Sequence, residues 1–205
     1  KEGVAQEEAG AHVLDVNVGL PEIDEPEMLE NCVRELQGVC DLPLQIDTPN
    51  PEAMARAMRI YNGKRMINSV NGDPKSMAAL FPLVKKYGGC VVCLTLDESG
   101  IPATAEGRYA VAEKIAGCAA EYGIALSDLI FDPLAMAVSA DSGAANVALD
   151  AVSLIRSRLG ARCSLGVSNI SFGLPDRDAV TAAFFIMALA RGLDAAILNP
   201  HSPEM

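Results

Sequence analysis

The chain has 205 residues, a formal net charge of −11 and a pI of about 4.6, and half of its residues are hydrophobic. Such an acidic chain lacks the basic face that phosphate backbones require and has little affinity for anionic membranes, so we expect neither nucleic acid nor membrane as a partner. No run of about 18 apolar residues occurs, so no transmembrane helix is expected. The hydrophobic content predicts one domain, residues 1–205, with a sizeable core.

Short apolar runs alternate along the chain with segments whose apolar residues recur every three or four positions. The runs are nearly continuous rather than alternating, which is typical of parallel strands buried on both faces. Strands are predicted at residues 12–18, 42–48, 64–70, 90–96, 129–134, 163–171 and 194–200. Helices are predicted at residues 25–39, 51–62, 74–88, 105–123, 145–160 and 178–192.

Strand-then-helix units in series predict an α/β fold, a TIM (β/α)8 barrel, rather than an open sheet. The first residues resemble the end of a helix, and the chain stops just after the last strand. We therefore expect a barrel that lacks strand 1 and helix 8, with an open edge at that seam, in a fragment of a longer protein. The motifs GxGxxG and GxxxxGK[ST] do not occur, which disfavours dinucleotide and P-loop sites.

Six cysteines lie scattered, mostly within apolar stretches, which favours a reduced, cytoplasmic chain. Cys90 and Cys93 are three residues apart in a predicted strand and would point to opposite faces, so they cannot share a metal ion. The only histidines are His12 and His201. We therefore expect no metal site in this chain.

Polar residues end the predicted strands, where a barrel of this kind builds its active site. A single such residue is usually a turn or cap residue, and Asp73 and Asp97 fit that explanation. Asp47, Asn68 and Asp132 instead lie within apolar runs, where an isolated carboxylate or amide would be buried without a partner. The candidate site residues at the strand ends are Asp15, Asn17, Asp47, Asn68, Asp132 and Asn169.

This set contains only carboxylates and amides, which narrows the ligand. The absence of a lysine at a strand end argues against Schiff-base chemistry, and the absence of a glycine-rich cradle disfavours a phosphorylated ligand. A carboxylate accepts two hydrogen bonds from an amino group and an adjacent ring N–H, and an amide can both donate and accept. An aminopyrimidinone ring, as in a pterin, fits this pattern.

Six motifs in order carry a resemblance to a known family: DVNVG, LQIDTPNPEAM, RMINSVN, LIFDPL, GVSNISFGLPDR and GLDAAILNP. Together they resemble the pterin-binding domain of methyltetrahydrofolate methyltransferases, including cobalamin-dependent methionine synthases. The resemblance implies a TIM barrel that binds 5-methyltetrahydrofolate, with the folate as substrate rather than as a resident cofactor. It also implies methyl transfer from N5 to the Co(I) of a cobalamin, or other corrinoid, carried on another domain or protein.

The resemblance further implies roles for individual residues. Asp47, Asn68 and Asp132 would bind the pterin, and Asp15 and Asn17 match less closely. Asn169 would act at N5 as a catalytic residue, with Asp132 and Asp47 relaying a proton through water. Arg177 would lie near the aminobenzoyl part of the folate.

Partners and alternatives follow from the same resemblance. A homocysteine-binding domain on the same full-length chain is one possible partner, and a homodimer stays open. Dihydropteroate synthase is the main alternative, but it uses a basic stretch where this chain has Ser168 to Ser171. A folate-binding module without catalysis is a second alternative. A sugar-metabolising barrel would require lysine or histidine at the strand ends.

Overall fold

The computed structural model describes residues 1–205 as a curved sheet of seven parallel strands in the order β1 to β7. The strands are β1 Leu14–Asn17, β2 Leu44–Asp47, β3 Met66–Asn71, β4 Cys90–Leu94, β5 Leu129–Asp132, β6 Arg162–Gly166 and β7 Ala195–Ile197. The helices are α1 Glu2–Glu8, α2 Glu25–Leu36, α3 Pro51–Ile60, α4 Pro74–Tyr87, α5 Ala105–Glu121, α6 Ala144–Leu154 and α7 Arg177–Ala190. A 3-10 turn precedes β5 at Leu126–Asp128, and a π turn extends α6 at Ile155–Leu159.

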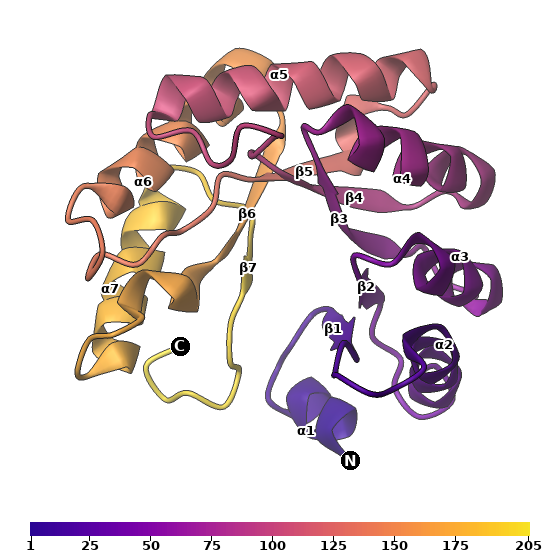
Figure 1. Ribbon diagram of the computed structural model, residues 1–205. Helices are drawn as coiled ribbons and strands as arrows, with labels where there is room; N and C mark the ends of the chain where they lie inside the picture. Colours follow the sequence, from indigo (N-terminus) through magenta and orange to yellow (C-terminus); the bar gives the residue numbers. More distant parts are fainter.

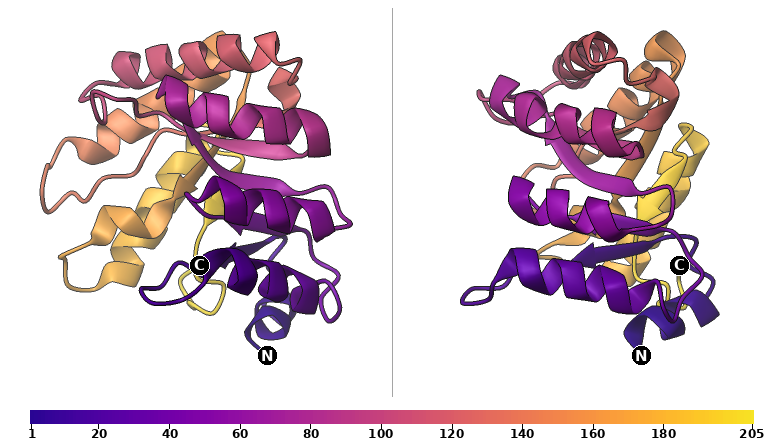
Figure 2. Two further views of the ribbon diagram at one scale, coloured as in Figure 1. Left: turned by 45° about the vertical axis from the view of Figure 1, so that its right-hand side comes forward. Right: turned by 90° about the vertical axis from the view of Figure 1, so that its right-hand side faces the viewer.

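Helices cover the outside of the curved sheet, and the arrangement confirms the predicted TIM-like barrel (Figures 1 and 2). β1 and β7 end the order and do not pair with each other, so the barrel is open at one seam and contains seven strands where a complete barrel has eight. Both figures place the C-terminal segment next to α1 and β1. The predicted open edge is therefore present in the structure.

The sequence signals that start and stop the helices act as expected. Asn50 accepts hydrogen bonds from the backbone N–H groups of Glu52 and Ala53, and Pro51 opens α3. Asp73 caps α4 in the same way, which confirms its predicted role. Gly88 ends α4 with a φ of +72°, a conformation that glycine adopts without steric cost.

Side chains along each strand point alternately to the two faces of the sheet. One face packs in the core, and the other faces the opening at the C-terminal ends of the strands, here called the mouth of the barrel. In β1, Leu14 and Val16 are buried against a core cluster of 39 residues between sheet and helices, whereas Asp15 and Asn17 point to the other face of the strand. Alternation of this kind brings polar side chains from neighbouring strands to the concave side of the sheet.

One predicted strand is shorter than expected. The sequence predicts strand at residues 163–171, but β6 ends at Gly166 and a 3-10 turn, η3, covers Val167–Ser171. Asn169 therefore does not lie in a strand, and the prediction is wrong at that point. Serine and asparagine side chains compete with ladder hydrogen bonds and favour turns, which explains why the strand stops before Ser168.

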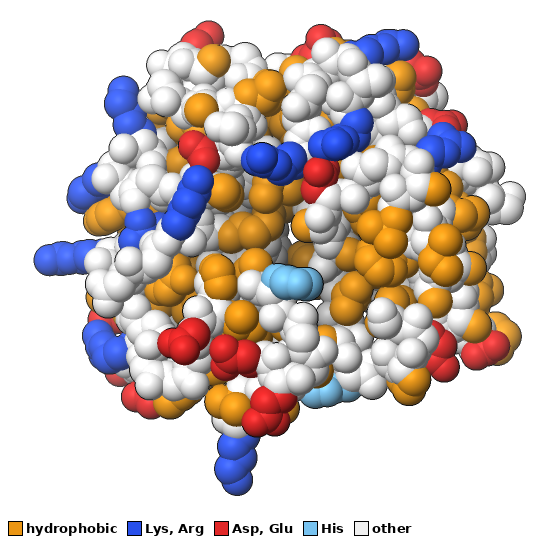
Figure 3. Space-filling view, turned by 180° about the vertical axis from the view of Figure 1, so that it is seen from behind, with side chains coloured by type: hydrophobic (Ala, Val, Ile, Leu, Met, Phe, Trp, Pro, Cys, Tyr) orange, Lys and Arg blue, Asp and Glu red, His pale blue; other side chains and the backbone are white.

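A hollow on the face opposite that of Figure 1 is surrounded by hydrophobic side chains (Figure 3). On α7, Ile186, Met187 and Leu189 are also exposed although the helix has an apolar buried face of its own. None of the helices has the length and apolar character needed to cross a bilayer.

Candidate functional site

Three of the candidate residues share one row across neighbouring strands. Asn17 is the register partner of Asp47, and Asp47 is the register partner of Asn68. The Asn17 amide Nδ2 donates to the Asp47 carboxylate Oδ2 at 2.8 Å, and the Asn68 carbonyl accepts from the Thr48 N–H at 3.1 Å. Parallel pairing therefore assembles an acidic and amide cluster at the C-terminal ends of β1 and β2 and the middle of β3.

A second polar pair lies one step deeper on the same strands. Gln45, which is only 3% exposed, donates from Nε2 to Asp15 Oδ1 at 2.6 Å. Burial raises the pKa of Asp15 to about 6, with the Gln45 hydrogen bond opposing the rise and the Asp47 charge adding to it. Gln45 is not among the site residues predicted from the sequence. The spacing could have identified Gln45 as a site residue, because residues two apart in a strand have their side chains on the same face, and Gln45 lies two residues before Asp47.

Asp47 itself is half-buried between these polar neighbours. Burial raises the pKa of its carboxyl group, the hydrogen bond from Asn17 lowers it, and the nearby Glu25 charge raises it again. Glu25, at the start of α2, also accepts a hydrogen bond from the Thr48 hydroxyl. The Asp47 carboxylate is thus half-buried among polar protein groups, where a hydrogen bond from a ligand N–H donor would be favourable.

Asp132 lies at the end of β5 and is 7% exposed. Its Oδ1 accepts the backbone N–H of Leu134 at 2.7 Å, and its backbone carbonyl accepts the N–H of Thr95, the residue after β4. Burial raises the pKa of the Asp132 carboxyl group to about 6, while the amides of Leu134 and Gly166 and the charge of Arg108 oppose that rise. A buried carboxylate at a strand end is suited to receive donors from a ligand.

Asn169 lies on η3, exposed to solvent, and its side chain makes no hydrogen bond within the protein. A Cβ atom at Gly166 would come within 3.2 Å of Asn169 Nδ2, so the absence of a side chain at Gly166 leaves room for the amide. The backbone carbonyl of Asn169 accepts from Phe172 at 3.3 Å. The turn thus leaves the Asn169 side-chain amide exposed and without a hydrogen-bond partner in the protein.

Arg177 supports the turn that carries Asn169. Its Nε donates to the Ser171 hydroxyl at 3.2 Å, and one terminal nitrogen donates to the Ser168 carbonyl at 3.1 Å. The guanidinium carbon also lies 4.5 Å from the ring centroid of the exposed Phe172. Arg177 thus braces both ends of η3 in addition to lying beside the mouth.

The structure therefore places the candidate residues in two groups on the same side of the sheet. Asp15, Asn17, Asp47 and Asn68 are joined through the first three strands, and Asn169 and Arg177 lie beyond β6, with Asp132 on β5 between the groups. No hydrogen bond joins the two groups directly. A ligand that bridged them would span the mouth of the barrel.

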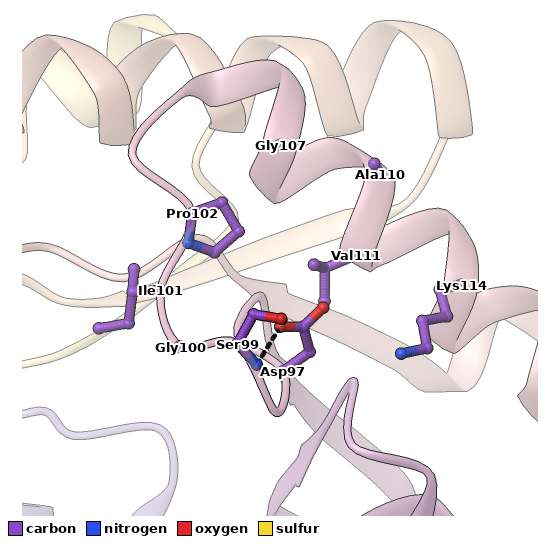
Figure 4. Close-up of a pocket in the computed structure, with 9 residues that line it drawn as sticks. All are labelled: Asp97, Ser99, Gly100, Ile101, Pro102, Gly107, Ala110, Val111 and Lys114. Atoms are coloured by element: carbon purple, nitrogen blue, oxygen red, sulfur yellow. Dashed lines mark hydrogen bonds between the residues drawn. The ribbon is translucent and has the colours of Figure 1, made fainter.

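A shallow cavity of about 390 Å³ lies apart from both groups, between the loop after β4 and the first half of α5 (Figure 4). Asp97 turns back to accept the Ser99 N–H at 2.9 Å there, which confirms Asp97 as a turn residue. Lys114 is the one positively charged residue in the lining. None of the candidate residues lines this cavity.

Comparison with known proteins identifies the family. Residues 1–199 match the family model for pterin binding enzymes. A methylcorrinoid:tetrahydrofolate methyltransferase of Eubacterium limosum is 31% identical over 206 residues, which cover 98% of this chain and 76% of that protein. Methionine synthase of Mycobacterium leprae is 28% identical over 95% of this chain but only 17% of its own length. The chain therefore corresponds to a small part of the methionine synthases and to about three quarters of the first relative.

Solved structures agree on the fold. Dihydropteroate synthase of Stenotrophomonas maltophilia matches with a TM-score of 0.76 at 20% identity, over 95% of this chain and 78% of that one. The enzyme of Yersinia pestis matches with a TM-score of 0.73 at 15% identity, over 95% of this chain and 80% of that one. These identities support the architecture alone. On the family match and the 31% identical relative, the chain belongs to the pterin-binding enzyme family.

Proposed function

We propose that this chain binds 5-methyltetrahydrofolate and transfers its N5 methyl group to the Co(I) of a corrinoid carried by another domain or protein. The observation that carries the proposal is the row of Asn17, Asp47 and Asn68 across β1 to β3, with Asp132 further round the same face. The similarity to a methylcorrinoid:tetrahydrofolate methyltransferase and to methionine synthases supports the same chemistry.

The pterin ring explains the composition of the site. Its 2-amino group and adjacent ring N–H are two donors on one edge, and an ionised carboxylate accepts both. Asp132 and Asp47 are the two carboxylates placed for that edge. Asn68 and Asn17 offer amides for the remaining ring nitrogens and the carbonyl, and Asp15 with Gln45 forms the polar layer beneath them.

Asn169 is the residue that we assign to N5. When the methyl group leaves, both electrons of the N5–CH3 bond stay on nitrogen, so N5 must be protonated before or during transfer for the amine to be a good leaving group. The bound corrinoid supplies the electron pair that forms the new bond to the methyl carbon. The Asn169 Oδ1 can accept a hydrogen bond from N5–H⁺, an interaction that neutral methylated N5 cannot make.

Asp132 has a second role in this proposal. With its pKa raised to about 6, the group exchanges a proton near neutral pH more readily than an ordinary aspartate. A water molecule between Asp132 and N5 would let the ionised carboxylate take up a proton from solvent and relay it to N5 during transfer. Arg177 and the exposed Phe172 lie beyond Asn169, where the aminobenzoyl part of the folate would leave the mouth.

Transfer in the opposite direction uses the same residues. The name of the Eubacterium limosum relative describes methyl transfer from a methylcorrinoid to tetrahydrofolate. Forward and reverse reactions share one transition state, so the Asn169 contact to N5 lowers the barrier in both. The methylation state of the partner then sets the direction.

The direct test is methyl transfer from 5-methyltetrahydrofolate to free cob(I)alamin, followed by the loss of the Co(I) absorption, alongside pterin binding measured by calorimetry. We expect Asn169→Ala to lower the transfer rate at least 10-fold with a change in the pterin Kd of less than 3-fold. Ser168→Ala is the matched control, because the exposed Ser168 contributes only its backbone carbonyl to Arg177. An equal loss of binding and rate in Asn169→Ala would contradict the N5 role.

The same assay separates the alternatives. A folate-binding module would bind 5-methyltetrahydrofolate without accelerating methyl loss. A dihydropteroate synthase would instead condense a pterin pyrophosphate with p-aminobenzoate and would show no transfer to cob(I)alamin.

A further inference from the structure

Arg108, in the first turn of α5, is a buried cation. The residue is 3% exposed, and its guanidinium donates to three backbone carbonyls: Pro102 at 3.1 Å, Pro133 at 2.6 Å and Leu134 at 2.7 Å. No carboxylate lies within 4.0 Å of it, since Arg108 takes part in none of the ion pairs of the structure. A buried charge without an ionic partner is unfavourable, and an apolar side chain of similar size would fill the space at less cost. The position of Arg108 therefore calls for a reason other than packing.

Two of the three carbonyls that Arg108 contacts, those of Pro133 and Leu134, belong to the loop that directly follows Asp132. Leu134 has a φ of +65°, a conformation disfavoured for a residue with a side chain. In that conformation its carbonyl accepts from Arg108 while its N–H donates to the Asp132 carboxylate at 2.7 Å. Arg108 also joins this loop to Pro102 in the loop before α5. The Arg108 side chain thus connects the loop before α5 with the loop after β5. It is linked to the Asp132 carboxylate through the backbone of Leu134.

We propose that Arg108 is a positioning residue for pterin binding: it holds Leu134 in its left-handed conformation so that the Asp132 carboxylate stays ionised and turned toward the mouth. This role rests on the proposed function, because Asp132 is the group that would accept the pterin donors. Arg108 does not touch the ligand itself, and it acts through the Leu134 peptide.

The electrostatic part of this role acts through space, without a direct ion pair between Arg108 and Asp132. The Arg108 charge favours ionised Asp132, and the reverse attraction partly opposes the lowering of the Arg108 pKa by burial. The other titratable group affected by Asp132 is the Cys163 thiol on β6, whose pKa burial raises to about 12, so it is neutral at working pH. The Arg108 cation is therefore the only charged group that assists Asp132.

The test uses Arg108→Met, Arg108→Lys and Asp132→Asn, with Lys114→Met as a matched control that removes a positive charge from the same helix at an exposed ion pair with Glu98. Binding of 5-methyltetrahydrofolate is titrated from pH 6 to pH 8.5, and folding is checked by circular dichroism. We expect Arg108→Met to raise the Kd about 10-fold at pH 6.5 and clearly less at pH 8.5, because the Asp132 pKa rises without the cation. Arg108→Lys should recover most of the affinity, and Lys114→Met should bind as the wild type does.

Combining the variants separates the outcomes. In the Asp132→Asn background, whose weakened binding is followed at millimolar ligand, the effect of Arg108→Met should shrink to less than 2-fold, because the two residues act as a unit. A 10-fold effect that is independent of pH and persists in that background would overturn the inference and leave Arg108 with packing alone. If Arg108→Met does not fold, Arg108→Lys and its pH profile decide the same question. A wild type that fails to bind the ligand would instead refute the proposed function.

Discussion

Asn17 and Asp47 lie side by side at the ends of β1 and β2, with the amide Nδ2 donating to the carboxylate Oδ2 at 2.8 Å. The amide nitrogen stabilises the ionised carboxylate in a place where burial raises its pKa. The same amide accepts the Gly19 N–H at 3.0 Å through its oxygen, which fixes its orientation. Asn17 thus serves the site by tuning and orienting Asp47.

Removing this amide should make pterin binding more sensitive to acid. In Asn17→Ala, the Asp47 pKa rises further because the lowering contribution of the hydrogen bond is lost, and the carboxylate is the binding form. We expect the Kd for 5-methyltetrahydrofolate to rise several-fold at pH 6 and much less at pH 8, measured by calorimetry. Asn31→Ala, the same chemical change on the exposed side of α2, is the control. A Kd ratio that stays constant across this pH range would show that Asn17 does not act through Asp47.

Asp132→Asn should stabilise the fold while weakening pterin binding. The pKa of Asp132 is raised from 3.8 to about 6, so the folded protein binds more protons than the unfolded chain between these values, and stability falls as pH rises through that window. The asparagine carries no such penalty and its Oδ1 can still accept the Leu134 N–H. We expect the variant to be more stable than the wild type by about 1–3 kcal/mol at pH 8, with the difference vanishing near pH 3.5.

The measurement is urea denaturation at pH 3.5, 6 and 8, with pterin titration in parallel. Binding should fall at least 30-fold because an amide cannot accept both donors of the pterin edge. A variant less stable than the wild type at pH 8 would mean that the Asp132 carboxylate stabilises the native state.

Gly166→Ala should displace the Asn169 amide. A Cβ atom at this position would lie 3.2 Å from Asn169 Nδ2, closer than side chains normally pack. The φ of Gly166 is −74°, which alanine adopts readily, so little loss of stability is expected. Methyl transfer to cob(I)alamin should fall about 10-fold while the pterin Kd changes little. Gly117→Ala, where no atom lies within 4 Å of the added Cβ, should leave the rate unchanged.

Tyr61→Phe should weaken the fold without affecting the site. The Tyr61 hydroxyl accepts the N–H of the fully buried Leu44 at 3.0 Å, at the end of β2 away from Asp47. Without that oxygen the buried N–H has no partner, which costs about 1–3 kcal/mol of unfolding free energy. Tyr87→Phe is the control, because the Tyr87 hydroxyl makes no hydrogen bond within the protein. Denaturant melts should separate the two variants, and an equal stability would contradict the assigned role of Leu44 and Tyr61.

Local patterns were enough to predict most of the fold. Continuous apolar runs predicted each strand within a few residues, and the cap residue Asp73 lies where the sequence signals placed it. The Asp47, Asn68 and Asp132 positions followed because the carboxyl ends of parallel strands meet at one edge. These features are set by residues that are close together in the sequence, so they can be predicted from it directly.

The turn at Asn169 could not be read from the local pattern. Val167 and Ile170 look like strand residues, yet both are buried as part of a 3-10 turn that Arg177 braces from the next helix. The local serine and asparagine residues favour a turn, and the hydrogen bond from Arg177 to the Ser168 carbonyl, nine residues away, stabilises it.

What the sequence alone determined is a set of strand ends with carboxylates and amides, and from these we predicted a pterin site. Only the tertiary structure decided which of these residues touch. The Asn17–Asp47 pair depends on strand register, Gln45 on its burial beneath Asp15, and Arg108 on the approach of a helix to the loop after β5. Arg108 in particular looks like an ordinary surface residue of an amphipathic helix, because a side chain's partner across space leaves no trace in the spacing of its own segment.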